Sequence, residues 1–135
     1  AHDYTYLVIK DEIRSKGNVE LKTPAEIVSF AATGTSIIKG DLVIGSDSDN
    51  AEEIKDISAL GMLKEIEGNI IIRNSYTGGT LTGLDNITKI GGLSIGSEEN
   101  LAANETLEMV SMTKLNEVTG NIHVYNNGVK FVQFG

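Results

Sequence analysis

The feature that most constrains the fold of this chain is a short phrase that recurs along it. In the phrase, an isoleucine or valine stands two positions before a glycine, and apolar residues alternate after the glycine. It occurs within residues 37–46, 64–74, 89–97 and 117–126, and in the third range the phrase itself (IGGLSI) lacks one residue compared with the others. An internal repeat of this kind predicts a stack of similar units that share one core, because a single unit cannot bury its apolar face alone.

The glycines of the phrase recur at similar intervals. Gly40, Gly68, Gly92 and Gly120 are separated by 28, 24 and 28 residues, and Gly17, 23 residues before Gly40, adds a fifth. Each glycine is followed by an alternating apolar pair, which is the period-2 pattern of a short half-buried strand. We expect each glycine to form a tight corner in a special backbone conformation. The apolar pairs are Val19 and Leu21, Leu42 and Ile44, Ile70 and Ile72, Leu93 and Ile95, and Ile122 and Val124.

Before three of these strands, apolar residues recur at every third position. This period fits neither a long α-helix nor a strand, and it predicts a 3₁₀-like path that returns one residue inward per turn. A short strand with such a return path is one coil of a solenoid, and coils of about 20–29 residues match leucine-rich-repeat-like stacks. The rows are Ile54, Ile57, Leu60, Leu63 and Ile66; Leu81, Leu84, Ile87 and Ile90; and Met109, Met112, Leu115 and Val118.

Polar residues recur two positions after the last apolar residue of the last four strands. They are Ser46, Asn74, Ser97 and Asn126. Because residues two apart in a strand face the same way, these side chains would form a hydrogen-bonded ladder at one corner of the stack. The alternative is that serine and asparagine are simply common turn residues.

Both ends of a repeat stack need a cap. We expect a capping helix over about residues 24–33 at the N-terminal end, because residues 23–34 (TPAEIVSFAATG) contain start and stop signals of a helix. The signals are Thr23 as N-cap, Pro24 at the first helical position, Glu26 in a capping box and Gly34 as the stop, with Ile27 and Phe30 toward the core.

The C-terminal residues 128–135 (GVKFVQFG) predict a last strand or cap through Val129, Phe131 and Phe134, or the point where a longer protein was divided. The sequence as a whole predicts one mainly β solenoid domain of about five coils over residues 17–135. Residues 1–16 precede it as a tail or a lead-in strand.

Composition limits the partners of the protein. Its net charge of −8 repels nucleic-acid phosphates and anionic membranes, so we expect neither as a partner. No apolar run approaches the roughly 20 residues of a membrane helix. The absence of cysteine excludes disulfides, thiol catalysis and cysteine-ligated zinc, and we expect no cofactor. The chain opens with AHDYTY and no methionine, which favours a trimmed or mature fragment.

The phrase Ile-x-Gly-x-Leu-x-Ile, preceded by apolar residues at every third position, resembles the receptor L-domain family. IKGDLVI, IEGNIII, IGGLSI and VTGNIHV carry the likeness over about residues 17–127, and TPAEIVSF matches the position of the capping helix. Animal members usually have disulfide-bonded ends, so the lack of cysteine favours the bacterial lipoprotein and fungal wall-protein branches. The resemblance implies a right-handed β-helix-like solenoid outside the cell that serves recognition or scaffolding, and not an enzyme.

Histidine and acidic side chains are the candidates for catalysis or metal binding in this sequence. His123 lies between two inward-facing residues, and with no nucleophile-elbow motif in the chain we expect an exposed sheet residue rather than a catalytic one. The acidic loop of residues 45–53 (GSDSDNAEE) is a weak calcium candidate, but it lacks the EF-hand glycine and final glutamate, so we expect a solvated loop. Its carboxylates belong to Asp47, Asp49, Glu52 and Glu53.

Two further loops and two matches to the glycosylation pattern have plain interpretations. The glycine-rich residues 75–80 (SYTGGT) lack the helix and lysine of a phosphate cradle, so we expect a loop at the coil edge. We expect residues 97–105 (SEENLAANE) to form a second acidic, solvated loop. Asn86 and Asn104 match the glycosylation pattern, although Asn86 stands inside a period-three row where a glycan would fit poorly.

The outer face of the main sheet is the candidate binding surface. Five strands at a spacing of about 4.8 Å make a face roughly 20 Å across. Apolar residues stand where solvent is expected, beside an arginine and a tyrosine, which are enriched at binding sites. The alternative is that β-branched residues favour strands on either face. The candidate residues are Val43, Ile71, Arg73, Ser94, His123 and Tyr125.

These features favour a non-catalytic cell-surface or extracellular module for recognition or adhesion. Its partner would be a protein or glycan, bound by the outer sheet face or the coil-edge loops. An alternative is a structural spacer of a larger surface protein, and an end coil also offers an edge for self-association. A polysaccharide-active β-helix enzyme is the least favoured hypothesis, because no paired carboxylates stand out on adjacent strands.

Overall fold

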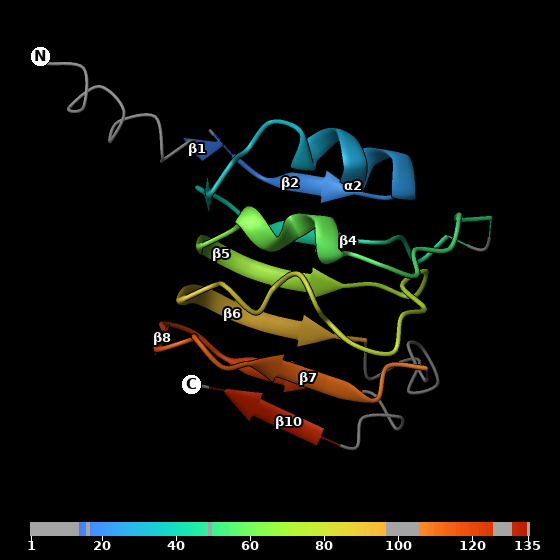
Figure 1. Cartoon of the computed structure of the whole chain (residues 1–135). Helices are drawn as coiled ribbons and strands as arrows, with labels where there is room; N and C mark the ends of the chain where they lie inside the picture. The colour runs from blue at the N-terminus through green and yellow to red at the C-terminus, as the bar shows by residue number, and fades with distance from the viewer. Residues whose placement is uncertain (1–13, 16, 49, 97–105, 126–130, 135) are drawn as a thin grey trace, which may run out of the picture.

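The computed structural model describes residues 14–15, 17–48, 50–96, 106–125 and 131–134 (Figure 1). Within this part, the chain is mainly β with an α-helix and a 3₁₀ helix. The elements are β1 (Arg14–Ser15), β2 (Val19–Leu21), α2 (Pro24–Ala31), β3 (Ile37–Ile38), β4 (Leu42–Ile44), η1 (Ser58–Met62), β5 (Glu65–Ile72), β6 (Lys89–Ile95), β7 (Met109–Met112), β8 (Glu117–Val118), β9 (Ile122–Val124) and β10 (Phe131–Phe134).

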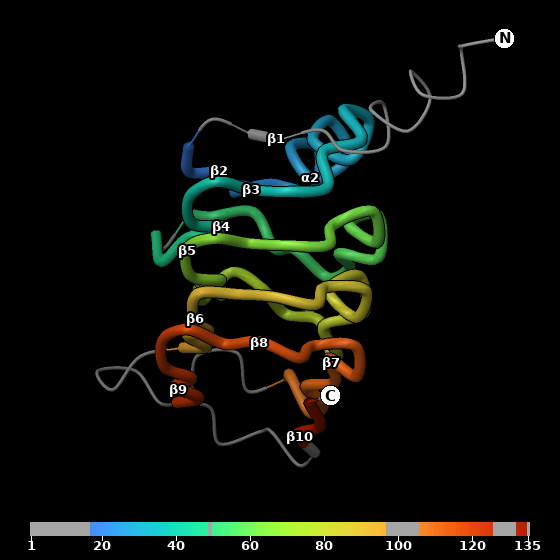
Figure 2. Tube along the Cα trace, turned by 90° about the vertical axis from the view of Figure 1, so that its left-hand side faces the viewer, coloured from blue at the N-terminus to red at the C-terminus, as the bar shows by residue number. Residues whose placement is uncertain are grey.

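The recurring phrases lie on neighbouring parallel strands, one level beneath the next (Figures 1 and 2). One row of pairs runs β2–β4–β5–β6–β9, and a second runs β1–β3–β5–β6–β8, so β5 and β6 are long enough to belong to both. Equivalent apolar residues face each other across the levels: Leu42 pairs with Ile70, Ile70 with Leu93, and Leu93 with Ile122. The predicted strands and their equivalence are therefore confirmed.

At four of the five glycines before the strands, a β-carbon would come too close to a neighbouring level, whereas at Gly17 no heavy atom lies within 4 Å of its position. Our expectation of a special backbone conformation at these glycines is wrong. The left-handed conformation occurs instead after the strands, at Gly45 (φ 91°) and Gly96 (φ 72°). At Gly68, a β-carbon would overlap the Asp41 Oδ1 atom and lie 2.7 Å from the carbonyl oxygen of Gly40 in the neighbouring level. A side chain at this position would force adjacent levels apart.

In the third phrase, Gly91 rather than Gly92 is the counterpart of the other glycines. Asn69 pairs with Gly92 across the ladder between β5 and β6, and the N–H of Gly120 donates to the carbonyl oxygen of Gly91. The register shifts between Ile66 and Asn69, where β5 has one more residue than β6. This irregularity explains why the third phrase is one residue short, and it corrects our assignment of Gly92.

The period-three rows follow the predicted 3₁₀-like path. The N–H of Leu60 donates to the carbonyl oxygen of Ile57 at 3.0 Å, and Leu63 donates to Leu60 at 3.0 Å, around η1. The second row repeats this pattern, with Leu84 donating to Leu81 at 3.1 Å. These residues are buried, so each short turn returns one apolar side chain to the shared core.

The third row departs from the prediction at its first residue. Because β7 is an extended strand, its side chains alternate: Val110 and Met112 are buried, whereas Met109 is 41% exposed. Our expectation that Met109 faces the core is therefore wrong.

Tyr76 is a core residue within the predicted glycine-rich loop. Its side chain is only 1% exposed, and its hydroxyl donates to the carbonyl oxygen of Thr80. Burial, followed by the negative charge of Asp56, raises the pKa of Tyr76 to about 12. A β-carbon at Gly78 would overlap the Tyr76 hydroxyl, so this glycine makes room for the ring.

The predicted capping helix is confirmed as α2, and it ends at Ala31, two residues before the predicted position. The Thr23 hydroxyl accepts the N–H of Glu26 at 3.1 Å, which is the predicted N-cap. The Glu26 carboxylate accepts the N–H of Lys22 at 2.7 Å rather than that of Thr23, so the capping box is displaced by one residue. Gly34 follows with a φ of 71°.

The two ends of the stack are closed differently. At the N-terminal end, Ile27 of α2 is buried and Phe30 packs against the core. At the other end, β10 pairs in parallel with β7, which confirms a strand at residues 131–134, while Val129 lies outside the described residues. Ile122, predicted to face the core, is 38% exposed because no described strand lies beyond β9 in this sheet.

The predicted ladder of Ser46 and Asn74 is replaced by other hydrogen bonds. The N–H of Ser46 donates to the Ser75 hydroxyl at 2.8 Å, and the N–H of Asn74 donates to Asp47 Oδ1 at 3.0 Å. Ser97 and Asn126 lie outside the described residues.

A side-chain ladder does exist at the start of the strands. Asn18 Oδ1 accepts the N–H of Asp41 at 2.8 Å, and Asp41 Oδ1 accepts the N–H of Asn69 at 2.8 Å. Each of these residues directly follows a phrase glycine, which was the sequence signal for this ladder. The ladder links three successive levels of the stack.

Candidate functional site

The outer face of the large sheet holds a column of side chains in register. The column begins at Glu20 on β2 and continues through Val43 on β4, Ile71 on β5, Ser94 on β6 and His123 on β9. On β4, β5 and β6 their neighbours along the strand, such as Leu42 and Ile44 beside Val43, belong to the core cluster, whereas the column residues do not. The predicted alternation therefore places these candidates together on one face.

Val43 is less accessible than the sequence suggested. It is 6% exposed, so our expectation of an apolar side chain in solvent is wrong at this position, and Ile71 beside it is half-buried. In a parallel ladder the in-register neighbours stack closely, so Glu20 and Ile71 flank Val43 on both sides. Val43 therefore supports this face rather than offering contact area.

A concavity of about 340 Å³ opens on this face between β5 and β9. Three of the predicted residues line it, namely Ile71, Ser94 and His123. Ser94 is the small middle member of the column, between a larger isoleucine and a larger histidine, and this difference in size accounts for the dip. The described residues that complete the lining are Asn69, Leu93, Gly120 and Asn121.

Asn69 and Asn121 line the concavity and were not among the predicted residues. Both directly follow a phrase glycine, and the corresponding position on β6 is Gly92. A β-carbon at Gly92 would lie 2.5 Å from Asn69 Oδ1 and 2.7 Å from the carbonyl oxygen of Asn121. The glycine on β6 thus lets the two asparagines from β5 and from the start of β9 approach the same place.

Two aromatic rings form one edge of the site. His123 and Tyr125 are stacked, with ring centroids 5.8 Å apart and planes 2° from parallel. The Tyr125 hydroxyl lies 3.4 Å from His123 Nδ1, and Tyr125 is half-buried. Each ring restricts the other, so the pair offers a flat surface at low cost in side-chain entropy.

Arg73 lies at the end of β5 and is engaged outside the concavity. Its Nη1 atom is 3.4 Å from Asp47 Oδ2. Both side chains are partly exposed, so this ion pair contributes little stability, about 0–1 kcal/mol. The pair joins a predicted binding residue to a predicted calcium ligand.

The acidic loop does not bring its carboxylates together in the described residues. The Asp47 carboxylate pairs with Arg73 and accepts the N–H of Asn74. Glu53 Oε2 lies 3.7 Å from Lys55 Nζ. Asp49 lies outside the described residues. Across the described part of the chain, no three histidine or acidic side chains gather in a way that could hold a metal ion.

Asn86 uses its side-chain amide within the fold. Its Nδ2 donates to the carbonyl oxygen of Gly61 at 2.8 Å, and its Oδ1 accepts from Lys114 Nζ at 2.9 Å. A glycan on Nδ2 would have to fit beside Gly61, which agrees with the poor fit expected from the sequence. Asn104 lies outside the described residues.

The concavity is neutral although the protein has a net charge of −8. Among its described lining residues there is no acid, lysine or arginine. Amide, hydroxyl and imidazole groups surround one isoleucine, so the site offers both donors and acceptors around a small apolar contact. Such a surface suits a partner with mixed polar and apolar groups rather than an ion.

A family model described as Receptor L domain matches residues 35–127, which are 93 of the 135 residues. The chain belongs to the receptor L domain family. This family comprises non-enzymatic ligand-binding domains, so membership identifies the general class of the protein. The matched range of this receptor L domain contains all the described residues of the concavity.

No curated protein matches the chain. In the described part of this receptor L domain, every helix is too short or too polar to cross a membrane.

Proposed function

We propose that this receptor L domain is a non-catalytic recognition module that acts outside the cell or on its surface. Its ligand is a protein or a glycan, and the ligand docks on the outer sheet face at the concavity of Asn69, Ile71, Ser94, Asn121 and His123. The observation that carries the proposal is that three neighbouring levels contribute polar and apolar groups to one neutral hollow.

The architecture we propose is a right-handed, β-helix-like solenoid of about five coils over residues 17–135. In-register parallel pairing between successive phrases supports it, as does one core cluster shared by all levels. The absence of cysteine supports a place among the microbial members of the family. This framework would hold the site residues on strands, where their positions are more precise than on loops.

The chemistry of the face supports recognition of a macromolecule. The stacked His123 and Tyr125 rings provide a rigid aromatic edge, and aromatic side chains contribute strongly at the centres of interfaces. Asn69 and Asn121 provide amides that can donate and accept beside them. A neutral hollow on an acidic surface disfavours polyanions, including nucleic acids.

The proposal can be tested by a binding screen of the purified protein against glycans, matrix proteins and wall polymers. The Ile71→Asp variant places a charge in the apolar centre of the concavity, and we expect it to weaken specific binding about tenfold or more. Val28→Asp is the matched control, because Val28 is 65% exposed on α2, away from this face. Circular dichroism establishes that both variants are folded.

The outcomes of the screen separate the functional hypotheses. Binding that is retained by Val28→Asp and lost by folded Ile71→Asp supports the outer face as the recognition site. Equal binding by both variants would overturn this assignment, and absence of binding across the panel would favour the spacer hypothesis. Concentration-dependent sedimentation of the wild-type protein tests self-association, for which the exposed Ile122 at the last level offers a contact.

A further inference from the structure

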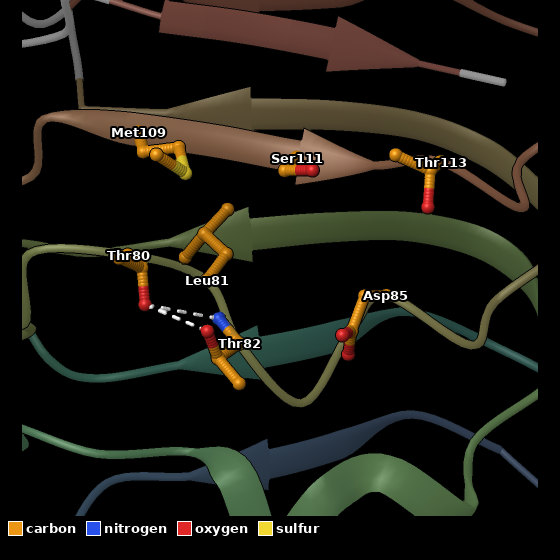
Figure 3. A pocket seen from close by; sticks show the side chains of 7 residues that line it. All are labelled: Thr80, Leu81, Thr82, Asp85, Met109, Ser111 and Thr113. Carbon is orange, nitrogen blue, oxygen red and sulfur yellow. Dashed lines mark hydrogen bonds between the residues drawn. The ribbon is translucent and has the colours of Figure 1, made fainter.

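A second concavity, of about 170 Å³, lies between β7 and the segment of residues 80–85 (Figure 3). Four of its described lining side chains carry a hydroxyl group and one carries a carboxylate. We infer that this concavity binds a single neutral saccharide unit. The lining residues are Thr80, Leu81, Thr82, Asp85, Met109, Ser111 and Thr113.

The second concavity is separate from the outer sheet face. β7 pairs with β10 in a two-stranded sheet, whereas the first concavity lies on the eight-stranded sheet. A parallel bridge between Thr80 and Met109 sets the two segments side by side. Because Val110 and Met112 point into the core, the alternate residues Met109, Ser111 and Thr113 point outward. The inference therefore does not depend on a ligand at the outer sheet face.

The hydroxyl groups retain capacity for a ligand. Thr80 Oγ1 and Thr82 Oγ1 lie 2.9 Å apart and hold each other in position. Within the described part of the chain, the hydroxyls of Ser111 and Thr113 make no hydrogen bond to protein. A hydroxyl both donates and accepts, as do the adjacent hydroxyls of a sugar, so the two sets are complementary.

The apolar part of the concavity matches the carbon side of a sugar ring. Met109 is 41% exposed at its rim, and the buried Leu81 lies at its base (Figure 3). A methionine side chain is flexible and polarizable, so it adapts to an irregular surface of C–H groups. The arrangement of hydroxyls facing an exposed methionine thus fits a pyranose better than a purely polar ligand.

The charge of the lining and the volume of the concavity further restrict the class of ligand. Asp85 is the one acid in the described lining, which contains no base, so a sugar acid would be repelled. A calcium ion needs about six to eight oxygen ligands, and no group of three acidic or histidine side chains is found among the described residues. At about 170 Å³, the hollow is smaller than the usual ligand pocket of roughly 300–1,000 Å³, so it holds one ring.

The test is a titration of the isotope-labelled protein, followed by amide nuclear magnetic resonance shifts. The probes are the methyl glycosides of glucose, galactose, mannose and N-acetylglucosamine, with glucuronate as the charged counterpart of glucose. We expect at least one neutral glycoside to shift amides of residues 80–85 and 109–113 in a saturable way. The expected Kd is on the order of 1 mM, because a single ring has few contacting atoms.

Thr113→Val removes one free hydroxyl at constant shape and should raise the Kd about 3- to 10-fold. Thr119→Val is the matched control, because Thr119 is also exposed but lies outside the concavity, and it should leave the Kd unchanged. Glucuronate should bind more weakly than the methyl glycoside of glucose. The inference is overturned if no neutral glycoside gives saturable shifts of the amides of residues 80–85 and 109–113, or if Thr113→Val binds the glycoside like the wild type. It is also overturned if glucuronate binds more tightly than the methyl glycoside of glucose.

Discussion

The phrase in the middle of the stack and the phrase at its last level have similar sequences and different surroundings. Residues 66–72 read IEGNIII and residues 118–124 read VTGNIHV, and both form strands at the same register. In the middle, β5 pairs with β4 and β6, and Ile70 is fully buried. At the last level, β9 pairs with β6 among the described strands, and the equivalent Ile122 is 38% exposed.

This difference shows that the phrase determines the strand and its register, whereas the neighbouring levels determine how deeply its side chains are buried. The alternation after each glycine sets the strand and its register, because the inward residues must match those of the next level. Burial comes from having a level on both sides, since each unit of a stack contributes a face and not a core. The same residue type at the same position of the phrase therefore contributes differently to the free energy of unfolding at each level.

The largest predicted effect compares these two isoleucines. Ile70→Ala removes a fully buried side chain and leaves a cavity between two levels, so it should destabilise the fold by about 2–5 kcal/mol. Ile122→Ala removes a partly exposed side chain and should cost under about 1 kcal/mol. Urea unfolding of both variants measures the difference, and equal losses would mean that the last level is as well covered as the middle.

The phrase glycines provide a second comparison between levels. Gly68→Ala should cost about 1–3 kcal/mol, because the new methyl group would overlap Asp41 Oδ1 and the Gly40 backbone. Gly17→Ala at the first level should change stability within about 0.5 kcal/mol, since no heavy atom lies within 4 Å of its β-carbon position. Thermal unfolding of the pair tests this, and a similar loss in Gly17→Ala would contradict the crowding argument.

A smaller effect concerns Tyr76, which is buried near the middle levels. Its pKa of about 12 in the folded protein is above the ordinary 10.0, so folding favours the protonated phenol. The contribution of this pKa difference to the free energy of unfolding is fully present below pH 10 and is lost as the pH rises from 10 toward 12. Tyr76→Phe should cost about 1 kcal/mol at neutral pH, through its lost hydrogen bond to Thr80, and should lessen the alkaline loss.

The measurement for Tyr76 is urea unfolding of the wild type and Tyr76→Phe across this alkaline range. The predicted result is two stability curves that converge as the pH rises. Parallel curves would show that the buried phenol is not the source of the alkaline sensitivity.

Much of the fold could be predicted because its signals are local. Alternation after each glycine predicted the strands, and the spacing of Ile57, Leu60 and Leu63 predicted 3₁₀-type turns. The errors arose where contacts between levels decide the outcome. Gly68 is required because Asp41 and Gly40 of another level approach it closely. Tyr76 is buried beside the segment of Ile54, and the residues next to Tyr76 in the sequence do not indicate this burial.

The candidate site was predicted in part for the same reason. Period-2 alternation placed Ile71, Ser94 and His123 on one outer face, but the hollow depends on the relative sizes of side chains on three different strands. Asn69 and Asn121 were missed, although each occupies the position after a phrase glycine. Comparing that one position across all repeats would have found them.

The most direct test of the central claim is a map of the contact surface for the ligand found in the binding screen. Amide shifts of the labelled protein, recorded with and without that ligand, report which residues it touches. We expect the largest changes to cluster on β5, β6 and β9, around Asn69, Ser94 and His123. Changes confined to α2 or another face, with these amides unaltered, would contradict it.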